Sequence, residues 1–167
     1  MIHPTCAEVL ATIETGLARD IVPHLHNTEA RSAAATIGHL LRHVALRIED
    51  EGQILSDDIA RLRRLVSELA GWLDGPVPPV AASLRATLEG DLPEGVYPSL
   101  RLLGERALAL RGALVAGQGE LHRLRASHGH DAGFQALESA IAAYGAQQLA
   151  DEGRLIEPAF LGKGPRR

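Results

Sequence analysis

The sequence predicts an all-α protein, an up-and-down helical bundle of four main helices with a short extra helix between the second and the third. Three observations support this fold class: apolar residues recur every three or four positions, no segment has the two-residue period of a half-buried strand, and the loops are short. We expect a single helical-bundle domain over residues 1–152 and a loosely ordered tail over residues 153–167. With 46% apolar residues among 167, the chain can bury a core of its own.

The first main helix is predicted from its start signal and from an apolar stripe. Thr5 and Glu8 have the spacing of a capping box, in which each side chain accepts a hydrogen bond from the backbone N–H of the other residue. Pro23 should end or kink the helix, because proline lacks the backbone N–H that an interior turn needs. The stripe consists of Leu10, Ile13, Leu17 and Ile21.

The second main helix begins near Asn27 or Thr28 and can run to Trp72 or Leu73, a length of ~68 Å at the α-helical rise. Gly52 is a weak helix former and residues 56–58 are a candidate new N-terminus, so the helix could break there. Because the apolar phase continues through this point, we favour one continuous or kinked helix. Its seam consists of Ile37, Leu40, Val44, Ile48, Glu51, Leu55, Leu62, Val66, Leu69 and Leu73.

The remaining helices follow a proline-rich linker, "DGPVPPV". A short helix is expected from about Pro79 to Leu88, followed by the irregular segment "EGDLPEGVYP". The third main helix has alternating spacings of three and four, typical of a bundle seam; the seam is Leu100, Leu103, Ala107, Leu110, Leu114, Gly117, Leu121 and Leu124. After the loop "ASHGHDAG", the last helix carries Phe134, Leu137, Ile141, Tyr144 and Leu149.

Composition excludes several classes of function. A net charge of −4 with almost no lysine does not predict a nucleic-acid-binding surface, and 3% aromatic residues provide no stacking platform for single strands. Cys6 is the only cysteine, so neither an internal disulfide nor a cysteine-rich zinc site is expected. The N-terminus lacks the pattern of a signal peptide, and no apolar run is long enough to span a membrane. We therefore expect a cytoplasmic protein.

Histidines are the first candidate site residues. His39 and His43 lie four residues apart on the second helix and could chelate a metal from one side, although a metal usually needs three or four protein ligands. In an up-and-down bundle with a continuous second helix, further histidines would lie toward the same end, and the cluster could bind a transition metal or respond to pH; they are His24, His26, His122, His128 and His130. The alternative is a solvated polar face, with some histidines favoured by helix C-termini.

Glu51 is the candidate buried carboxylate, because it falls inside the apolar seam, where an unpaired charge is costly. It could bind a metal or a cationic ligand, or act as a base with a raised pKa. Alternatively, a kink near Gly52 lets it reach water, or it pairs with an arginine such as Arg111.

No catalytic residue is predicted. The chain has no glutamate followed three residues later by histidine, no His-Glu-x-x-His, no phosphate-binding glycine loop and no Gly-x-Ser-x-Gly. The thiol of Cys6 lies in a first helical turn, but no histidine partner is evident. The sequence favours a protein that is not an enzyme.

The segments "HPTCAEVLATIETGLARDIVPHL" and "ARSAAATIGHLLRHVALRIEDE" resemble an uncharacterised family of all-helical bacterial proteins. Members are often encoded beside aminoglycoside-phosphotransferase-like kinases or acyl-CoA dehydrogenases. The likeness covers roughly the first 70 residues and rests on the Pro-Thr start, the Leu-rich first helix and the long second helix. It implies an accessory protein in a metabolic pathway and gives no residue a role.

Two hypotheses for function remain. The first is a non-enzymatic helical interaction module that binds a protein partner or forms a homodimer, since unequal helix lengths leave surface to cover. The second is a bundle that binds a metal or small ligand at a histidine-rich end, with no other cofactor.

Overall fold

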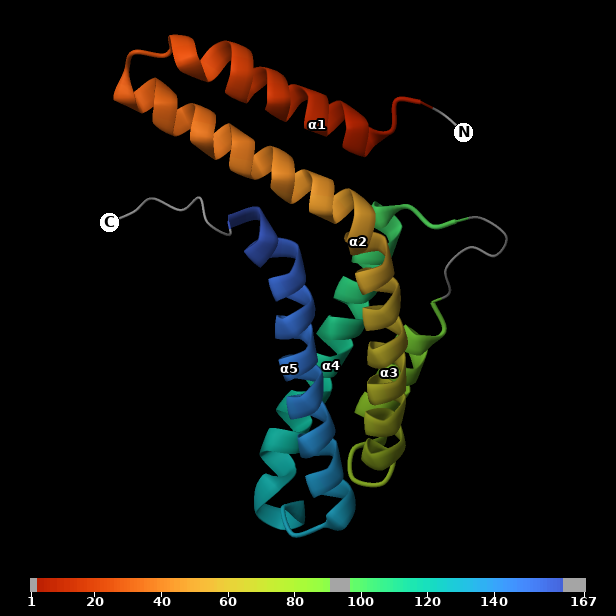
Figure 1. Ribbon diagram of the computed structural model, residues 1–167. Coiled ribbons are helices and arrows are strands. Elements are labelled where there is room, and N and C mark those ends of the chain that lie inside the picture. Colours follow the sequence, from red (N-terminus) through yellow and green to blue (C-terminus); the bar gives the residue numbers. More distant parts are fainter. Residues whose placement is uncertain (1–2, 91–96, 161–167) are drawn as a thin grey trace. The chain divides into compact units, whose positions relative to one another are not determined.

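The computed structural model describes residues 3–90 and 97–160, and all regular secondary structure in these residues is helical. The predicted all-α class is therefore confirmed. Backbone contacts divide the chain into two compact units: unit 1 comprises the residues up to Gly52 and those from Ala150 onward, and unit 2 comprises Gln53–Leu149. The α-helices are α1 (Cys6–Gly16), α2 (Thr28–Leu73), α3 (Pro78–Leu88), α4 (Leu100–His128) and α5 (Ala132–Phe160) (Figure 1).

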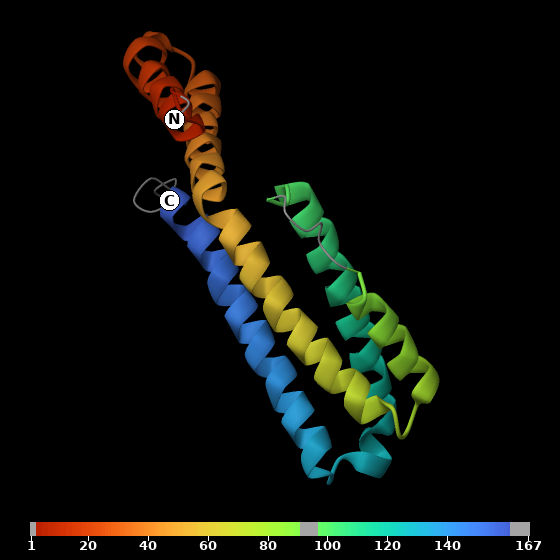
Figure 2. The same cartoon turned by 90° about the vertical axis from the view of Figure 1, so that its right-hand side faces the viewer.

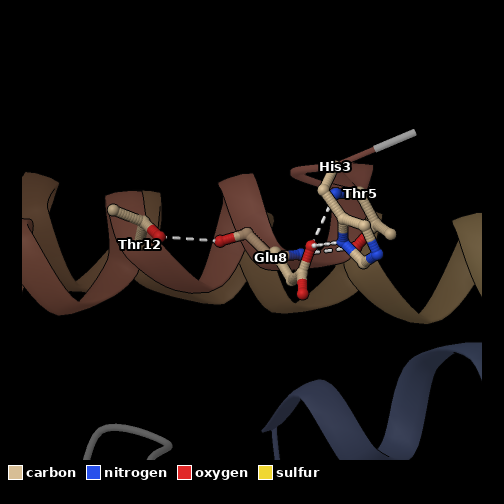
Figure 3. Close-up of polar contacts among 4 residues, drawn as sticks. All are labelled: His3, Thr5, Glu8 and Thr12. Carbon is tan, nitrogen blue, oxygen red and sulfur yellow. Dashed lines mark hydrogen bonds and ion pairs between the residues drawn. The ribbon is translucent and has the colours of Figure 1, made fainter. Parts of the chain in front are cut away.

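The N-terminus of α1 has the predicted capping box (Figure 3). Thr5 Oγ1 accepts a hydrogen bond from the Glu8 N–H at 3.2 Å, and Glu8 Oε2 accepts one from the Thr5 N–H at 2.6 Å. Nδ1 of His3 lies 3.3 Å from the same carboxylate oxygen. The hydrogen bond from the Thr5 backbone, assisted by His3, holds the pKa of Glu8 below its usual value.

After α1 the helix type changes twice, first to a wider π-helical turn and then to a narrower 3-10 turn. A π-helical turn, η1 (Leu17–Ile21), and a 3-10 turn, η2 (Val22–His24), follow it directly. Pro23 lies in this last turn, so the helical path ends there as predicted.

Helix α2 is one α-helix of 46 residues, without interruption at Gly52. Asn27 caps its start, since Asn27 Oδ1 accepts a hydrogen bond from the Glu29 N–H at 2.8 Å. The continuous helix favoured by the apolar phase is confirmed, and its predicted bounds are correct.

Unit 2 contains the hydrophobic core. The second half of α2, α4 and α5 lie side by side, with α3 against α4 (Figures 1 and 2). Gly117 of α4 lies against Leu69 of α2, where an added Cβ would overlap the leucine side chain. Near the α4–α5 turn, the Trp72 ring packs edge-on against the rings of Phe134 and His128, with centroids 5.6 Å apart in both pairs.

The sequence-predicted seams of α4 and α5 are mostly correct. In α4 six predicted seam residues are buried, and Leu124 packs against the core. The exceptions are Leu100 and Leu149, which are exposed. The buried seam residues of α4 are Leu103, Ala107, Leu110, Leu114, Gly117 and Leu121.

Three predictions concern packing and boundaries. The first main helix belongs to unit 1 and α2 contributes to both units, so the packing of all four main helices into one up-and-down bundle stays a prediction. Residues 153–160 of the predicted tail belong to α5, while 161–167 lie outside the described residues. The predicted irregular segment falls largely on residues 91–96, which are also outside them. None of the described helices is both long and apolar enough to cross a membrane.

Candidate interaction surface

The apolar seam of α2 is buried in unit 2 and exposed in unit 1. In unit 2 Leu55 is partly buried, and the rest of the seam is completely buried. These completely buried residues are Leu62, Val66, Leu69 and Leu73. In unit 1 the exposed fractions are 47% for Ile37, 57% for Leu40 and 44% for both Val44 and Ile48. We call these four residues the α2 stripe. They repeat at spacings of three and four residues, so they follow the same helix face as the buried seam.

Helix α1 does not cover the α2 stripe, because it contacts α2 through a different face. Arg42 donates a hydrogen bond from Nη1 to Glu14 Oε1 at 2.5 Å, which ties α2 to α1. The small residues Ala34 and Gly38 are buried on this side of α2. On a helical wheel, Gly38 and Arg42 lie more than 90° from the centre of the stripe.

Unit 1 consequently has very little core. Among its described residues, Ala34 is the one buried hydrophobic residue. The apolar stripe predicted for the first main helix, now divided between α1 and η1, is only partly covered. Leu10 and Leu17 are half-buried, whereas Ile13 and Ile21 are about half exposed. This unit therefore presents large apolar side chains that the rest of the described chain does not bury.

His39 and His43 have opposite hydrogen-bonding roles. Nδ1 of His39 lies 2.8 Å from Arg42 Nη2 and must accept, because a guanidinium only donates. Nδ1 of His43 lies 2.9 Å from the backbone carbonyl oxygen of Leu155 and must donate. In its neutral form His39 therefore has its proton on Nε2. Neutral His43 has its proton on Nδ1, so its Nε2 atom has the lone pair. In this arrangement the two rings do not offer two free lone pairs to one metal.

The other predicted histidines are distributed over both units. His24 and His26 are exposed near the η2 turn, and His122, His128 and His130 lie at or near the end of α4. Within residues 3–90 and 97–160, no group of three or more His, Cys, Asp or Glu side chains is arranged to hold a metal. Cys6 is exposed in the first turn of α1.

Glu51 pairs along its own helix rather than with Arg111. Arg47 donates from Nε to Glu51 Oε2 at 2.8 Å, and the Glu51 side chain is 19% exposed. This hydrogen bond lowers the pKa of Glu51, and the positive charge of Arg47 adds to the effect, although burial opposes it. The pKa of Glu51 is therefore lowered, whereas the predicted role of Glu51 as a base needs a raised pKa.

The buried carboxylate that pairs with Arg111 is Asp58, which is not among the predicted seam or site residues. Arg111 Nη2 donates to Asp58 Oδ2 at 2.8 Å, and Arg111 Nε donates to the Tyr144 hydroxyl at 3.3 Å. The Asp58 side chain is only 3% exposed, and its Oδ1 has no hydrogen-bond partner among the described residues. Burial raises the pKa of Tyr144, although the hydrogen bond from Arg111 opposes the rise.

One signal in the sequence could have identified Asp58. The predicted seam steps seven residues from Leu55 to Leu62, whereas a helix face needs a member every three or four residues. The missing member must be residue 58 or 59. Asp58 and Ile59 are both buried.

Comparison with known proteins gives no relative: no family model, no curated protein and no solved structure matches the chain.

Proposed function

We propose that the chain is a non-enzymatic helical interaction module that self-associates by covering the α2 stripe with a second copy. The observation that carries this proposal is the contrast along α2, where one apolar face packs into the core of unit 2 but is about half exposed in unit 1. Such uncovered apolar surface is typical of an interaction site.

A second copy of the chain suits the stripe, because two such stripes can meet without bringing like charges together. No charged residue lies on this helix face between Ile37 and Val44. The charged residues at its end, Arg47 and Glu51, already neutralise each other. In a two-fold dimer the same surface meets itself, so a stripe free of unbalanced charge incurs no like-charge repulsion.

The expected association is weak. Fully burying a Val, Leu or Ile side chain contributes about 1.5–3 kcal/mol, so covering the exposed half of each stripe residue contributes about 1 kcal/mol. Eight such residues in a dimer contribute about 8 kcal/mol, against an association cost of about 4–15 kcal/mol. We therefore expect a dimer that depends on concentration. It would be strengthened if the exposed Ile13 of α1 and Ile21 of η1 also became covered.

Unit 2 serves in this proposal as the scaffold, with α2, α3, α4 and α5 following one another in an up-and-down path. The contact of Leu69 with Gly117 and the packing of α3 on α4 support this role. The resemblance to bacterial accessory proteins suggests that the module acts in a metabolic pathway, in the cytoplasm.

Sedimentation velocity over a range of concentrations tests the proposal. Leu40→Glu should abolish the dimer, because it places a charge at the most exposed position of the stripe. Leu108→Glu is the matched control: Leu108 is also an exposed leucine, at 70%, but it lies on α4. A wild-type monomer at all concentrations would refute self-association, and a dimer lost only in Leu108→Glu would move the interface to α4.

Metal binding stays a second, weaker proposal, carried by His43. Its Nδ1 donates to a backbone carbonyl, an arrangement typical of metal-ligating histidines. Elemental analysis of protein purified without a histidine tag, followed by zinc titration, tests it. Stoichiometric metal that is lost in His43→Ala would support a site, and protein that stays metal-free would exclude one.

A further inference from the structure

A pocket of about 210 Å³ lies within unit 1, between the end of α1 and the first half of α2. Its apolar lining includes Leu17 and Val22 from the η1 and η2 turns and Ala34 from α2. The volume corresponds to about seven waters, which is enough for a short aliphatic chain but not for a drug-sized molecule.

Two local features leave this pocket unfilled by the chain's own side chains. On α2 the pocket is lined by Ala34, Ala35 and Gly38, whose side chains are too short to fill it. On the other side, η1 is a π-helical turn, wider than an α-helical one. Such turns are rare and frequently lie at functional sites.

The polar lining carries an excess of positive charge. Arg42 and Glu14 line the pocket and form an ion pair, which leaves Arg31 as the cation that no carboxylate balances there. Arg31 Nε donates to the backbone carbonyl of Leu25 at 2.7 Å. This bond holds the guanidinium in place, and its two Nη groups have no partner among the described residues. An arginine oriented in this way presents two parallel N–H donors that suit a carboxylate.

We propose that this pocket binds a small carboxylate with an aliphatic tail. The Arg31 guanidinium binds the carboxylate, and the tail packs against Leu17, Val22 and Ala34. This inference is independent of self-association, because none of these residues belongs to the α2 stripe.

The test is an NMR titration with octanoate, read from the backbone amides of the residues that line the pocket. Octanamide, which has the same tail but no charge, is the ligand control and should bind about tenfold more weakly or not at all. Arg31→Gln should weaken octanoate binding about tenfold and leave octanamide unchanged. Arg19→Gln is the matched control, because Arg19 is a highly exposed arginine of η1 outside the pocket lining.

A second variant tests the tail. Ala35→Leu fills the pocket from a surface position of α2 that suits leucine, so it should abolish octanoate binding while the circular dichroism spectrum stays helical. The proposal is overturned if octanoate shifts no pocket amide at millimolar concentration, if octanamide binds as tightly, or if both the Arg31 and the Ala35 variant bind octanoate like the wild type.

Discussion

Asp58 of α2 and Arg111 of α4 form an ion pair inside unit 2, with Asp58 Oδ2 accepting from Arg111 Nη2 at 2.8 Å. Removing one partner of a buried pair leaves the other charge uncompensated, at a cost of about 3–5 kcal/mol. Arg111 is about one-third exposed, so we expect Asp58→Ala to lower the free energy of unfolding by less, about 2–3 kcal/mol. Urea denaturation measures this loss.

Two further variants make that measurement specific. Asp57→Ala, at the exposed neighbouring carboxylate, should change stability by no more than about 0.5 kcal/mol. The double variant Asp58→Leu with Arg111→Met should recover much of the loss, because apolar replacements leave no buried charge. An Asp58→Ala protein as stable as the wild type would show that the pair contributes nothing.

Replacing Gly117 should destabilise the protein because of the adjacent Leu69 side chain and not because of the backbone conformation of the glycine. An added Cβ would overlap the Leu69 side chain, so Gly117→Ala must separate α2 from α4 or repack the leucine. Overpacking costs about 1–3 kcal/mol and the gain in helix propensity about 1 kcal/mol, so we expect a net loss of about 1–2 kcal/mol. Gly112→Ala on the same helix meets no atom within 4 Å and should stabilise. Thermal unfolding of both variants checks the opposite signs.

The Arg47–Glu51 pair should make a small contribution to stability that depends on pH. The pKa of Glu51 is lowered below its ordinary 4.5, so its ionised form is favoured in the folded state. The contribution is fully present above the unfolded pKa and is lost as pH falls through the folded pKa. Glu51→Gln should be less stable than the wild type by about 0.5 kcal/mol at neutral pH, and the difference should vanish in acid. An equal difference at both pH values would contradict the assignment.

His43 should hold the end of α5 against α2 through its hydrogen bond to Leu155. We expect His43→Ala to speed amide hydrogen exchange over residues 150–156, because the local opening of this turn becomes easier. His39→Ala is the control, because the His39 ring bonds to Arg42 of its own helix. Unchanged exchange in the His43 variant would mean that this bond does not stabilise the turn.

Secondary structure was largely predictable from sequence because local signals agree with it. The capping box at Thr5, the Asn27 cap and the three-four spacing in α4 are each set by nearby residues. The continuity of α2 followed from the uninterrupted apolar phase, which prevailed over the weak helix propensity of Gly52.

Which apolar helix faces are buried was not predictable from the sequence, because burial depends on which helices pack against one another. Periodicity predicted the α2 stripe to be core like the rest of the seam, but only the second half of α2 is covered. Glu51 and Asp58 are both acidic residues on or beside this seam. Arg111 pairs with Asp58 and not with Glu51, and this choice depends on packing between helices that are far apart in sequence. The roles of His39 and His43 likewise depend on Arg42 and the Leu155 carbonyl.

Pulsed electron spin resonance tests most directly whether two copies of the chain meet over the α2 stripe. A single nitroxide is placed at Thr36, an exposed residue beside the stripe, in a Cys6→Ser background. We expect a defined distance between the labels of two chains, and we expect this distance to be lost when Leu40→Glu is added. Labels that show no distance between chains, or one that persists in the Leu40→Glu variant, would contradict a dimer over the α2 stripe.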